Sequence, residues 1–219
     1  MPGVADIVFL GVAPAKAKVL CIFVHGRSQS PEEMEAAVIR RLSAPDVAFA
    51  LPRAKNKSWY TARAIDPLTD ATRIELSASL QGLAQAITDL RAKAPGLPLV
   101  LAGFSQGACL SLEHAFTGQF TPDAVAAFTG CRVGLPDDDR PANLPSGLPV
   151  YLSAGSADTW IPIQAFAETV AALGQAEANL RCDVFPGRPH EVSVPEIALL
   201  DSLLNDLAAG RTPRMEAPR

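Results

Sequence analysis

A short apolar segment that ends in a glycine-flanked serine constrains this chain more than any other feature. Residues 99–103 (LVLAG) predict a short buried strand, and residues 108–115 predict the first turns of a helix. Ser105 lies at the junction, with Gly103 and Gly107 two residues away on either side. A strand that turns at once into a helix strains the junction residue, and bulky neighbours would collide there. The pattern therefore predicts a serine hydroxyl held at the carboxyl edge of a sheet.

The same residues also fit a simpler interpretation, a glycine-rich turn that carries a surface serine. Gly-x-Ser-x-Gly by itself is weak evidence, so the strand before it and the helix after it decide in favour of a nucleophile. The backbone amide of Gln106 would then lie at a helix N-terminus. A developing negative charge is stabilised at that position.

Length and composition are those of a packed α/β domain. The chain has 219 residues, of which 48% are hydrophobic and 19% charged, too apolar for a disordered protein. We expect a single domain over residues 1–209 and a flexible C-terminal tail over 210–219, where no periodicity remains. The net charge of −4 gives no basic field, so we expect no nucleic-acid partner. No apolar run reaches membrane-spanning length, so we expect no integral membrane association.

The first residues and the cysteines favour a cytoplasmic protein. Residues 1–20 lack the basic region, apolar region and cleavage site of a secretory signal. Cys21, Cys109, Cys131 and Cys182 are scattered through separate predicted elements without C-x-x-C pairing. We therefore expect reduced, mostly buried thiols, no metal and no cofactor.

Strands and helices alternate along the chain. The apolar patterns predict strands at 6–10, 18–24, 46–51, 99–103, 124–128, 149–154 and 180–185 and helices at about 31–42, 72–94, 108–115, 163–173 and 195–208. A turn-prone segment between the first two strands suggests an antiparallel opening that leads into a central strand. The alternation predicts an α/β fold, with a mostly parallel sheet covered by helices on both faces.

Three candidate catalytic side chains each follow a predicted strand. Ser105, Asp158 and His190 would all lie at the carboxyl edge of the sheet, where α/β proteins place their functional groups. Their chain order is that of α/β-hydrolases. His190 would take the proton of Ser105 during attack on a carbonyl, and Asp158 would orient the imidazole and stabilise its charged form. For Asp158 the simpler alternative is a cap of the following turn.

Two further loops complete the predicted pocket. Residues 25–27 (HGR) follow a strand and form the kind of turn that places a second backbone amide, that of Arg27, beside the amide of Gln106. Each such donor contributes about 3–4 kcal/mol to stabilising an oxyanion. Trp59 and Tyr60 follow another strand and are expected to wall the pocket, unless they pack over the sheet edge.

The other two histidines are interpreted as structural. His25 would shape the loop that follows it through hydrogen bonds, with proton transfer as the alternative. His114 lies inside the helix after Ser105, and helix geometry directs it away from the serine.

Together these segments resemble the phospholipase/carboxylesterase family of α/β-hydrolases, which includes bacterial carboxylesterases and acyl-protein thioesterases. The resemblance is carried by FVHGRSQSPEEM near residue 25, SWY at 58–60, LAGFSQGA at 101–108, SAGSADTWIP at 153–162 and FPGRPHEVS at 185–193. It implies an α/β-hydrolase fold. The roles that it implies are nucleophile, acid and base for Ser105, Asp158 and His190, oxyanion amides for Arg27 and Gln106, and acyl-site residues for Trp59 and Ile161.

The chain departs from the family at the first of these loops. The family often has glycine at the position of Ser28 and leucine at that of Arg27. A basic side chain there, near a loop that carries Arg53, Lys55, Lys57 and Arg63, favours a substrate with a carboxylate or phosphate, unless these charges are merely solvated.

The expected activity is hydrolysis of small to medium acyl esters by a serine carboxylesterase. The partner would be a small-molecule ester or thioester, and a homodimer is compatible with the sequence. Acyl-protein thioesterase or lysophospholipase activity is the alternative, and it needs an open hydrophobic groove. A further alternative is a ligand-binding homologue without catalysis, which would need none of the three catalytic residue types.

Overall fold

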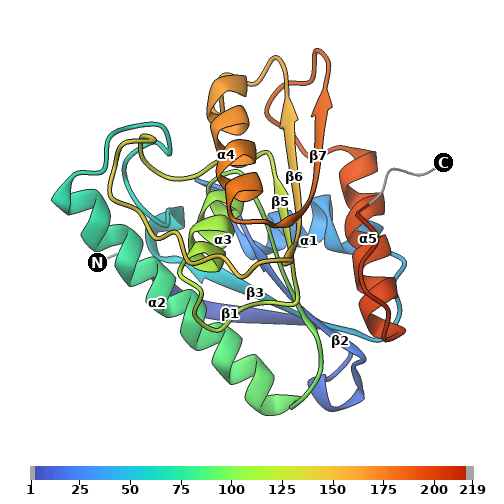
Figure 1. The fold of residues 1–219 in the computed structure, drawn as a ribbon. Coiled ribbons are helices and arrows are strands. Elements are labelled where there is room, and N and C mark those ends of the chain that lie inside the picture. Colours follow the sequence, from blue (N-terminus) through green and yellow to red (C-terminus); the bar gives the residue numbers. More distant parts are fainter. Residues whose placement is uncertain (1–2, 216–219) are drawn as a thin grey trace.

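A sheet of seven strands forms the centre of the structure, a computed structural model that describes residues 3–215 (Figure 1). The strands are β1 (Val4–Gly11), β2 (Val19–Val24), β3 (Val47–Ala54), β4 (Leu99–Phe104), β5 (Ala124–Phe128), β6 (Pro149–Gly155) and β7 (Asn179–Phe185). Their order across the sheet is β1-β3-β2-β4-β5-β6-β7. β1 runs antiparallel to β3, and the other neighbouring strands are parallel. The predicted mostly parallel sheet is confirmed.

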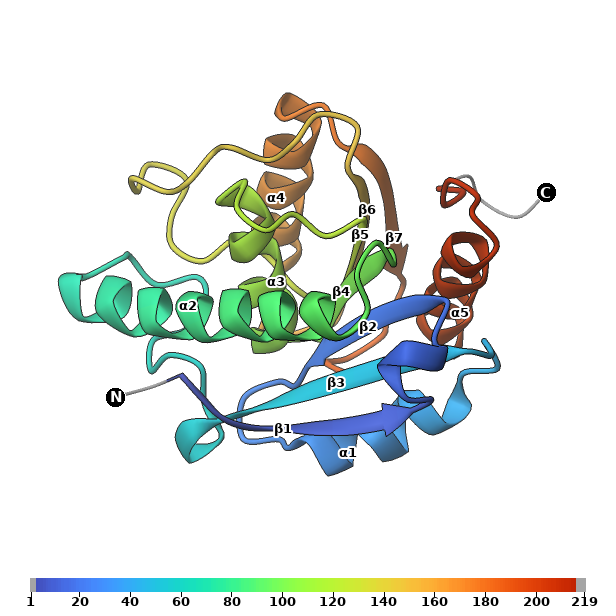
Figure 2. The same cartoon turned by 90° about the horizontal axis from the view of Figure 1, so that it is seen from below.

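Helices cover both faces of the sheet (Figures 1 and 2). They are α1 (Pro31–Ala37), α2 (Asp70–Lys93), α3 (Gln106–Phe116), α4 (Ile163–Gln175) and α5 (Val194–Ala208), with short 3₁₀ helices η1 (Pro14–Lys16), η2 (Ile39–Arg41) and η3 (Lys55–Lys57). The odd-numbered residues of β2 pack with α1 and α5, and the even-numbered ones with α2 and α3. Successive residues of a strand face opposite sides of the sheet, so the fully buried strand β2 contributes side chains to the hydrophobic core on each face.

Two local predictions differ from the structure. The opening strand is antiparallel as expected, but it pairs with β3 and so lies at the edge of the sheet, away from β2. The helix expected over 31–42 ends at Ala37, because Val38 leaves helical geometry with φ −126° and ψ −62°. The turn η2 that follows places Ile39 in the core, packed with α5.

The connections around β2 place several loops at one edge of the sheet. The chain passes from β2 through α1 to β3 on one side, and then through α2 to β4 on the other side of β2. The loops after β2 and β4 therefore leave in opposite directions and open a crevice at the carboxyl ends of these strands. β6 and β7 run parallel to them, so their following loops reach the same edge.

The segment after α5 is held against the domain as far as it is described. Arg211 pairs with Asp206 over 2.8 Å, and the side chain of Met215 is packed in the core beside α5. We expected a flexible tail from residue 210, and these contacts are at odds with that for residues 211–215. Residues 216–219 of the expected tail lie outside the described residues.

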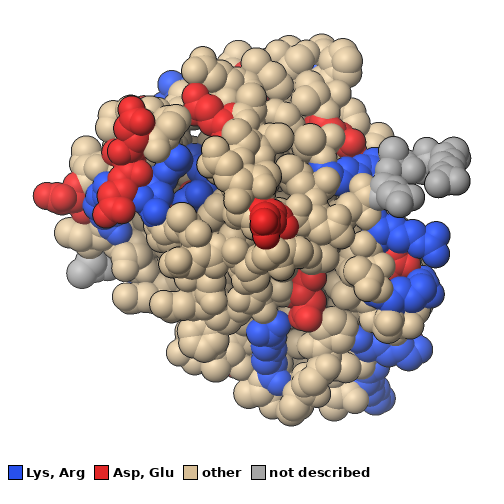
Figure 3. Space-filling model, in the orientation of Figure 1, with Lys and Arg blue, Asp and Glu red and all other residues tan. Residues whose placement is uncertain are grey.

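Charged side chains of both signs are visible on the face that Figure 3 shows. In the view of Figure 3, Lys and Arg lie mainly at the two edges, with Asp and Glu among them, and uncharged side chains fill most of the area between. Within residues 3–215, no helix is both long enough and apolar enough to cross a membrane.

A buried ion pair holds the connection between β5 and β6, which contains neither helix nor strand. Arg132 Nε donates to Glu113 Oε1 over 2.6 Å, and its Nη2 donates to Oε2 over 3.0 Å. Glu113 also accepts a hydrogen bond from the backbone amide of Val133. The two charged side chains are only 6% and 2% exposed. Because water reaches neither charge, each buried charge is stabilised mainly by its partner in the pair.

We expect Glu113→Gln to destabilise the protein strongly, because it leaves the buried Arg132 guanidinium without a counter-charge. The free energy of unfolding should fall by about 3–5 kcal/mol, which lowers Tm by more than about 6 °C. The control is Arg40→Gln, which removes a pair to Glu35 in which Arg40 is 70% exposed, and it should cost less than about 1 kcal/mol. Thermal unfolding measures both. Equal Tm values for Glu113→Gln and the unmodified protein would contradict the role assigned to this pair.

Candidate active site

Ser105 is the single residue between β4 and α3, and its backbone is strained. It has φ 55° and ψ −122°, outside the regions that residues with a side chain ordinarily occupy. A Cβ atom on Gly103 would lie 2.6 Å from the backbone carbon of Gly107, and one on Gly107 would lie 2.1 Å from the carbonyl oxygen of Val24. Both positions therefore need glycine because the backbone segments approach too closely for any side chain.

Ser105, His190 and Asp158 form a continuous chain of hydrogen bonds. His190 Nε2 lies 2.7 Å from Ser105 Oγ, and His190 Nδ1 lies 2.7 Å from Asp158 Oδ2. The structure thus brings together three residues that follow three different strands, β4, β6 and β7. Ring N–H and hydroxyl groups at these distances form good hydrogen bonds.

The carboxylate of Asp158 is held ionised in a largely buried position. Burial acts to raise its pKa, but hydrogen bonds from His190 and from the backbone amides of Ile161 and Trp160 outweigh burial, so the pKa lies below its ordinary value. The two amides donate to Oδ1 over 2.9 and 2.7 Å, which leaves Oδ2 for the histidine. An ionised Asp158 favours a proton on His190 Nδ1 and leaves the Nε2 lone pair facing the serine hydroxyl.

A second buried carboxylate fixes the loop that carries His190. Glu196, in the first turn of α5, is fully buried and pairs with Arg188 of that loop. Arg188 Nη2 also donates to Thr129 Oγ1, at the end of β5, over 2.9 Å, and Ser153 of β6 donates to Glu196. The loop before His190 is therefore tied to two strands and a helix. No periodic pattern in the sequence indicates this network, because its members come from four separate segments.

Two backbone amides beside Ser105 are available as donors. The N–H of Gln106 is the first in α3 and so has no acceptor within the helix. Gly26 and Ser28 donate to Gln29 Oε1 and to the carbonyl of Lys57, while the N–H of Arg27 between them has no acceptor among the described residues. A Cβ on Gly26 would lie 3.2 Å from the Cβ of Ser105, so this loop abuts the serine. Both predicted oxyanion amides are thus free and near it.

Ser28 occupies the left-handed region of the backbone, with φ 62°. Glycine adopts this conformation without the steric cost that a side chain brings. This accounts physically for the glycine that the resembling family often has there.

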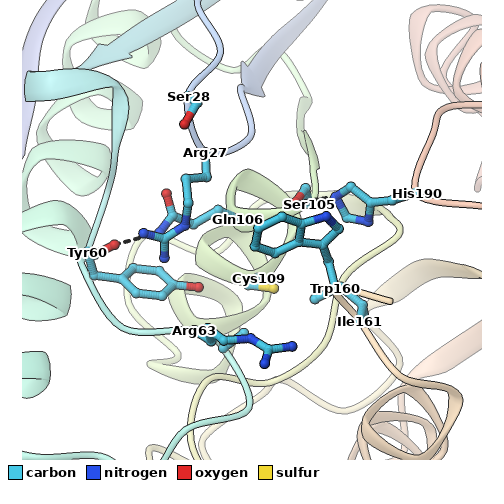
Figure 4. Close-up of a pocket in the computed structure, with 11 residues that line it drawn as sticks. Arg27, Ser28, Tyr60, Arg63, Ser105, Gln106, Cys109, Trp160, Ile161 and His190 are labelled. Carbon is cyan, nitrogen blue, oxygen red and sulfur yellow. Dashed lines mark hydrogen bonds between the residues drawn. The ribbon is translucent and has the colours of Figure 1, made fainter. Parts of the chain in front are cut away.

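The prediction that Trp59 contacts a substrate is wrong, because its side chain is fully buried and does not line the cavity at Ser105. Trp59 Nε1 donates to the carbonyl of His25 over 2.8 Å, so Trp59 stabilises the loop after β2. Its neighbour Tyr60 lines the cavity instead. The side chain of Gln106 accepts from the amide of Trp59 and donates to the carbonyl of Tyr60, and so ties the aromatic loop to α3 (Figure 4).

The other two histidines lie away from the serine. His25 is fully buried, and its Nε2 accepts a hydrogen bond from the amide of Ala54 over 3.0 Å. Burial lowers the pKa of His25, so it is neutral, with its proton on Nδ1. It joins the ends of β2 and β3, in line with the structural interpretation. His114 is buried in α3 and is not among the residues that line the cavity at Ser105.

A cavity of about 250 Å³ opens beside Ser105 (Figure 4). It is lined by Arg27, Ser28, Tyr60, Arg63, Ala64, Ser105, Gln106, Cys109, Trp160, Ile161 and His190. Ile161 is there as predicted. Two further members carried a signal in the sequence, since Cys109 lies one helical turn after Ser105 and Trp160 precedes Ile161. Arg63 is marked in the sequence only as one of several basic residues in its loop, and Ala64 carried no signal, because the course of that loop depends on contacts with distant segments.

The sequence matches the model of the phospholipase/carboxylesterase family over residues 11–207. The chain belongs to this family. The match extends from the end of β1 through most of α5 and includes every residue of the site described above. It confirms the resemblance and the α/β-hydrolase fold that it implies.

Solved structures of related proteins agree. The crystal structure of a phospholipase/carboxylesterase from Dyadobacter fermentans has 28% sequence identity and a TM-score of 0.81, and the alignment covers 92% of this chain and 97% of that one. Zea mays acyl-protein thioesterase 2 (15% identity, TM-score 0.68, 93% and 99% covered) and a Bacillus cereus carboxylesterase (15%, 0.68, 91% and 93%) share the fold. No curated protein matches the sequence.

The phospholipase/carboxylesterase family is one of esterase-like and thioesterase-like hydrolases, and the geometry found here suits that chemistry. An ionised carboxylate, an imidazole and a hydroxyl in hydrogen-bonded sequence can generate a nucleophile. Two free amides beside the hydroxyl can stabilise an oxyanion.

We expect Gly107→Ala to destabilise the protein, because the new methyl group would collide with the Val24 carbonyl oxygen, a backbone atom that cannot move aside cheaply. The loss should exceed about 2 kcal/mol, as for other overpacked interiors. The control is Gly174→Ala in the exposed part of α4, where a Cβ meets no atom within 4 Å, and it should stabilise by about 0.5–1 kcal/mol. Chemical unfolding of both variants measures the difference. Equal stability of Gly107→Ala and the unmodified protein would contradict the close approach of Gly107 to the Val24 carbonyl group.

We expect the contribution of Asp158 to stability to depend on pH. Its pKa is lower in the folded protein, so the ionised group stabilises the fold above its unfolded pKa of about 4, and this stabilisation is lost as the pH falls through the lower folded value. The gap in unfolding free energy between the unmodified protein and Asp158→Asn should therefore narrow between pH 5 and pH 3. Urea unfolding at several pH values tests this. A gap that stays constant or widens over this range would be inconsistent with the hydrogen bonding described.

Proposed function

We propose that this chain is a serine carboxylesterase that hydrolyses small to medium acyl esters through an acyl-enzyme on Ser105. The observation that carries the proposal is the unbroken hydrogen-bonded chain from Asp158 through His190 to Ser105. A ligand-binding protein would need none of these three groups in register. The strained backbone at Ser105 supports the same conclusion, since strain of this kind is retained mainly at functional sites.

The proposed reaction uses only side chains and amides of the chain. His190 Nε2 takes the proton of Ser105 as Oγ attacks the ester carbonyl, and Asp158 stabilises the imidazolium that forms. The backbone amides of Gln106 and Arg27 then stabilise the oxyanion of the tetrahedral intermediate. His190 gives the proton to the alcohol oxygen as the ester C–O bond breaks, so that the alcohol leaves and the acyl group remains on Ser105. His190 then takes a proton from the water that attacks the acyl carbonyl and returns it to Ser105 Oγ, which releases the carboxylic acid and restores the serine.

The size of the cavity favours short acyl groups. Its volume of about 250 Å³ lies below the usual range of about 300–1,000 Å³ for ligand pockets. Tyr60, Cys109 and Ile161 are buried side chains that limit its depth. A long acyl chain, as a lysophospholipase or an acyl-protein thioesterase would accept, needs a longer apolar groove. We therefore prefer the carboxylesterase to these alternatives.

A series of 4-nitrophenyl esters from acetate to palmitate tests the proposal. We expect kcat/KM to be highest for short acyl chains and Ser105→Ala to lose at least about 10⁴-fold in activity. The control is Ser77→Ala on the exposed side of α2, which should leave kcat/KM unchanged. A fluorophosphonate probe should label the unmodified protein and not Ser105→Ala.

Other results would separate the alternatives. A maximum at long acyl chains would favour lysophospholipase or thioesterase activity. Activity that survives in Ser105→Ala would reject the assigned nucleophile. The absence of both turnover and labelling would indicate a ligand-binding member of the family.

A further inference from the structure

The cavity beside Ser105 is positively charged. Two arginines, Arg27 and Arg63, are among the residues that line it, and none of the lining residues is Asp or Glu. The carboxylate of Asp158 lies behind His190, and its side chain is fully shielded from solvent. A ligand that enters the cavity therefore meets two guanidinium groups.

Arg27 is fixed in the cavity wall without a counter-ion. Its Nη1 donates to the carbonyl of Thr61 over 2.9 Å and its Nη2 to that of Ala62 over 2.5 Å. A weaker contact of 3.4 Å joins Nη1 to Ser58 Oγ. These acceptors are all uncharged, and within residues 3–215 no carboxylate lies within ion-pair distance of Arg27. The side chain is half-buried, so its charge is only partly screened by water.

Arg63 lies across the cavity from Arg27, with Tyr60 between them (Figure 4). Its Nη2 reaches the carbonyl of Thr159 at 3.5 Å, so the exposed side chain spans from its own loop to the loop after β6. The nearby Asp66 accepts from the backbone amide of Arg63, not from its guanidinium. Arg53, at the end of β3, differs from these two arginines because its guanidinium is paired with the carboxylates of Glu32 and Asp6.

The hydroxyl of Tyr60 is a further donor without a good partner. It is buried in the cavity wall, and no oxygen or nitrogen in the described part of the chain accepts from it. Figure 4 shows it pointing towards the sulfur of Cys109, which is a weak acceptor. Burial raises the pKa of Tyr60, so the hydroxyl keeps its proton. Buried donors of this kind usually have an acceptor.

We propose that the cavity selects esters whose acyl group carries a carboxylate, that is, monoesters of short dicarboxylic acids. The inference rests on the proposed ester hydrolysis at Ser105 and names its substrate class. A planar carboxylate matches the geometry of a guanidinium group. A short diacid fits a cavity of about 250 Å³ between the serine and the two arginines.

The first test compares monoethyl succinate with ethyl succinamate, in which a neutral amide replaces the carboxylate. We expect kcat/KM, followed by ethanol release, to favour the anionic ester by about tenfold. This preference should weaken between 20 and 500 mM NaCl because Arg63 is exposed and its charge is screened by salt. A neutral ester that reacts equally well or faster would overturn the proposal.

Variants of Arg63 test whether this exposed arginine causes the preference for the anionic ester. Arg63→Gln should lower the ratio of the two kcat/KM values about fivefold, and Arg63→Lys should retain most of it because the charge remains. The control is Lys57→Gln, a cation of the same loop that does not line the cavity, and its ratio should equal that of the unmodified protein. An unchanged ratio in Arg63→Gln, or an equal fall in Lys57→Gln, would reject the role of Arg63.

Binding to Ser105→Ala separates this proposal from the proposed hydrolysis. Calorimetry with the two intact esters should give tighter binding for monoethyl succinate, whether or not the unmodified protein turns over any ester. If tighter binding is found without turnover in the unmodified protein, the anion selectivity stands and the hydrolysis fails. If the two esters bind alike, the selectivity fails, whatever the activity.

Discussion

The backbone of α3 touches the carbonyl end of β2 at Gly107, and the geometry of the whole site depends on that contact. It brings the beginning of the helix so close to the sheet that Ser105 must adopt a strained conformation in the single residue between β4 and α3. The strain directs the hydroxyl out of the sheet edge. The same contact places the amides of Gln106 and of the loop after β2 on one side of the serine, because that loop begins where Gly107 packs.

A pair of buried carboxylates positions the other half of the site. Asp158 binds the imidazole of His190 directly, and Glu196 binds Arg188 two residues before it. A buried carboxylate is costly unless it is fully satisfied, and each of these has a cationic or ring N–H partner as well as backbone amides. These contacts tie the histidine loop, which has no secondary structure of its own, to α5, to β6 and to the end of β5. Arg27 acts in a similar way on the loop of Tyr60, but it does so through carbonyl groups, and so its positive charge remains unbalanced at the cavity.

The sequence allowed good prediction where the signal is local. The strands, the long apolar stripe of α2 and the junction at Ser105 follow from periodicity and from glycine spacing within a few residues. Because serine, aspartate and histidine each follow a predicted strand, they are expected at one edge of a parallel sheet. Local signals failed for Trp59, because an aromatic side chain after a strand can turn into the core or into the cavity, and hydrogen bonding to His25 decided for the core. They failed also for residues 211–215, since the pairing with Asp206 depends on where α5 ends.

By itself the sequence determined the fold class, the family and the three residues that carry the proposed chemistry, since glycine spacing, hydrophobic periodicity and residue type are properties of short segments. Only the tertiary structure decided which side chains surround the serine. Tyr60, Arg63, Cys109 and Trp160 belong to three different segments, and their meeting at one cavity depends on how the loops cross above the sheet. Whether a charge is paired is likewise a property of the folded chain. The sequence marks Arg27 and Arg63 as basic residues near the serine but leaves open whether their charges are merely solvated, and only their neighbours in space show that uncharged carbonyl groups hold them.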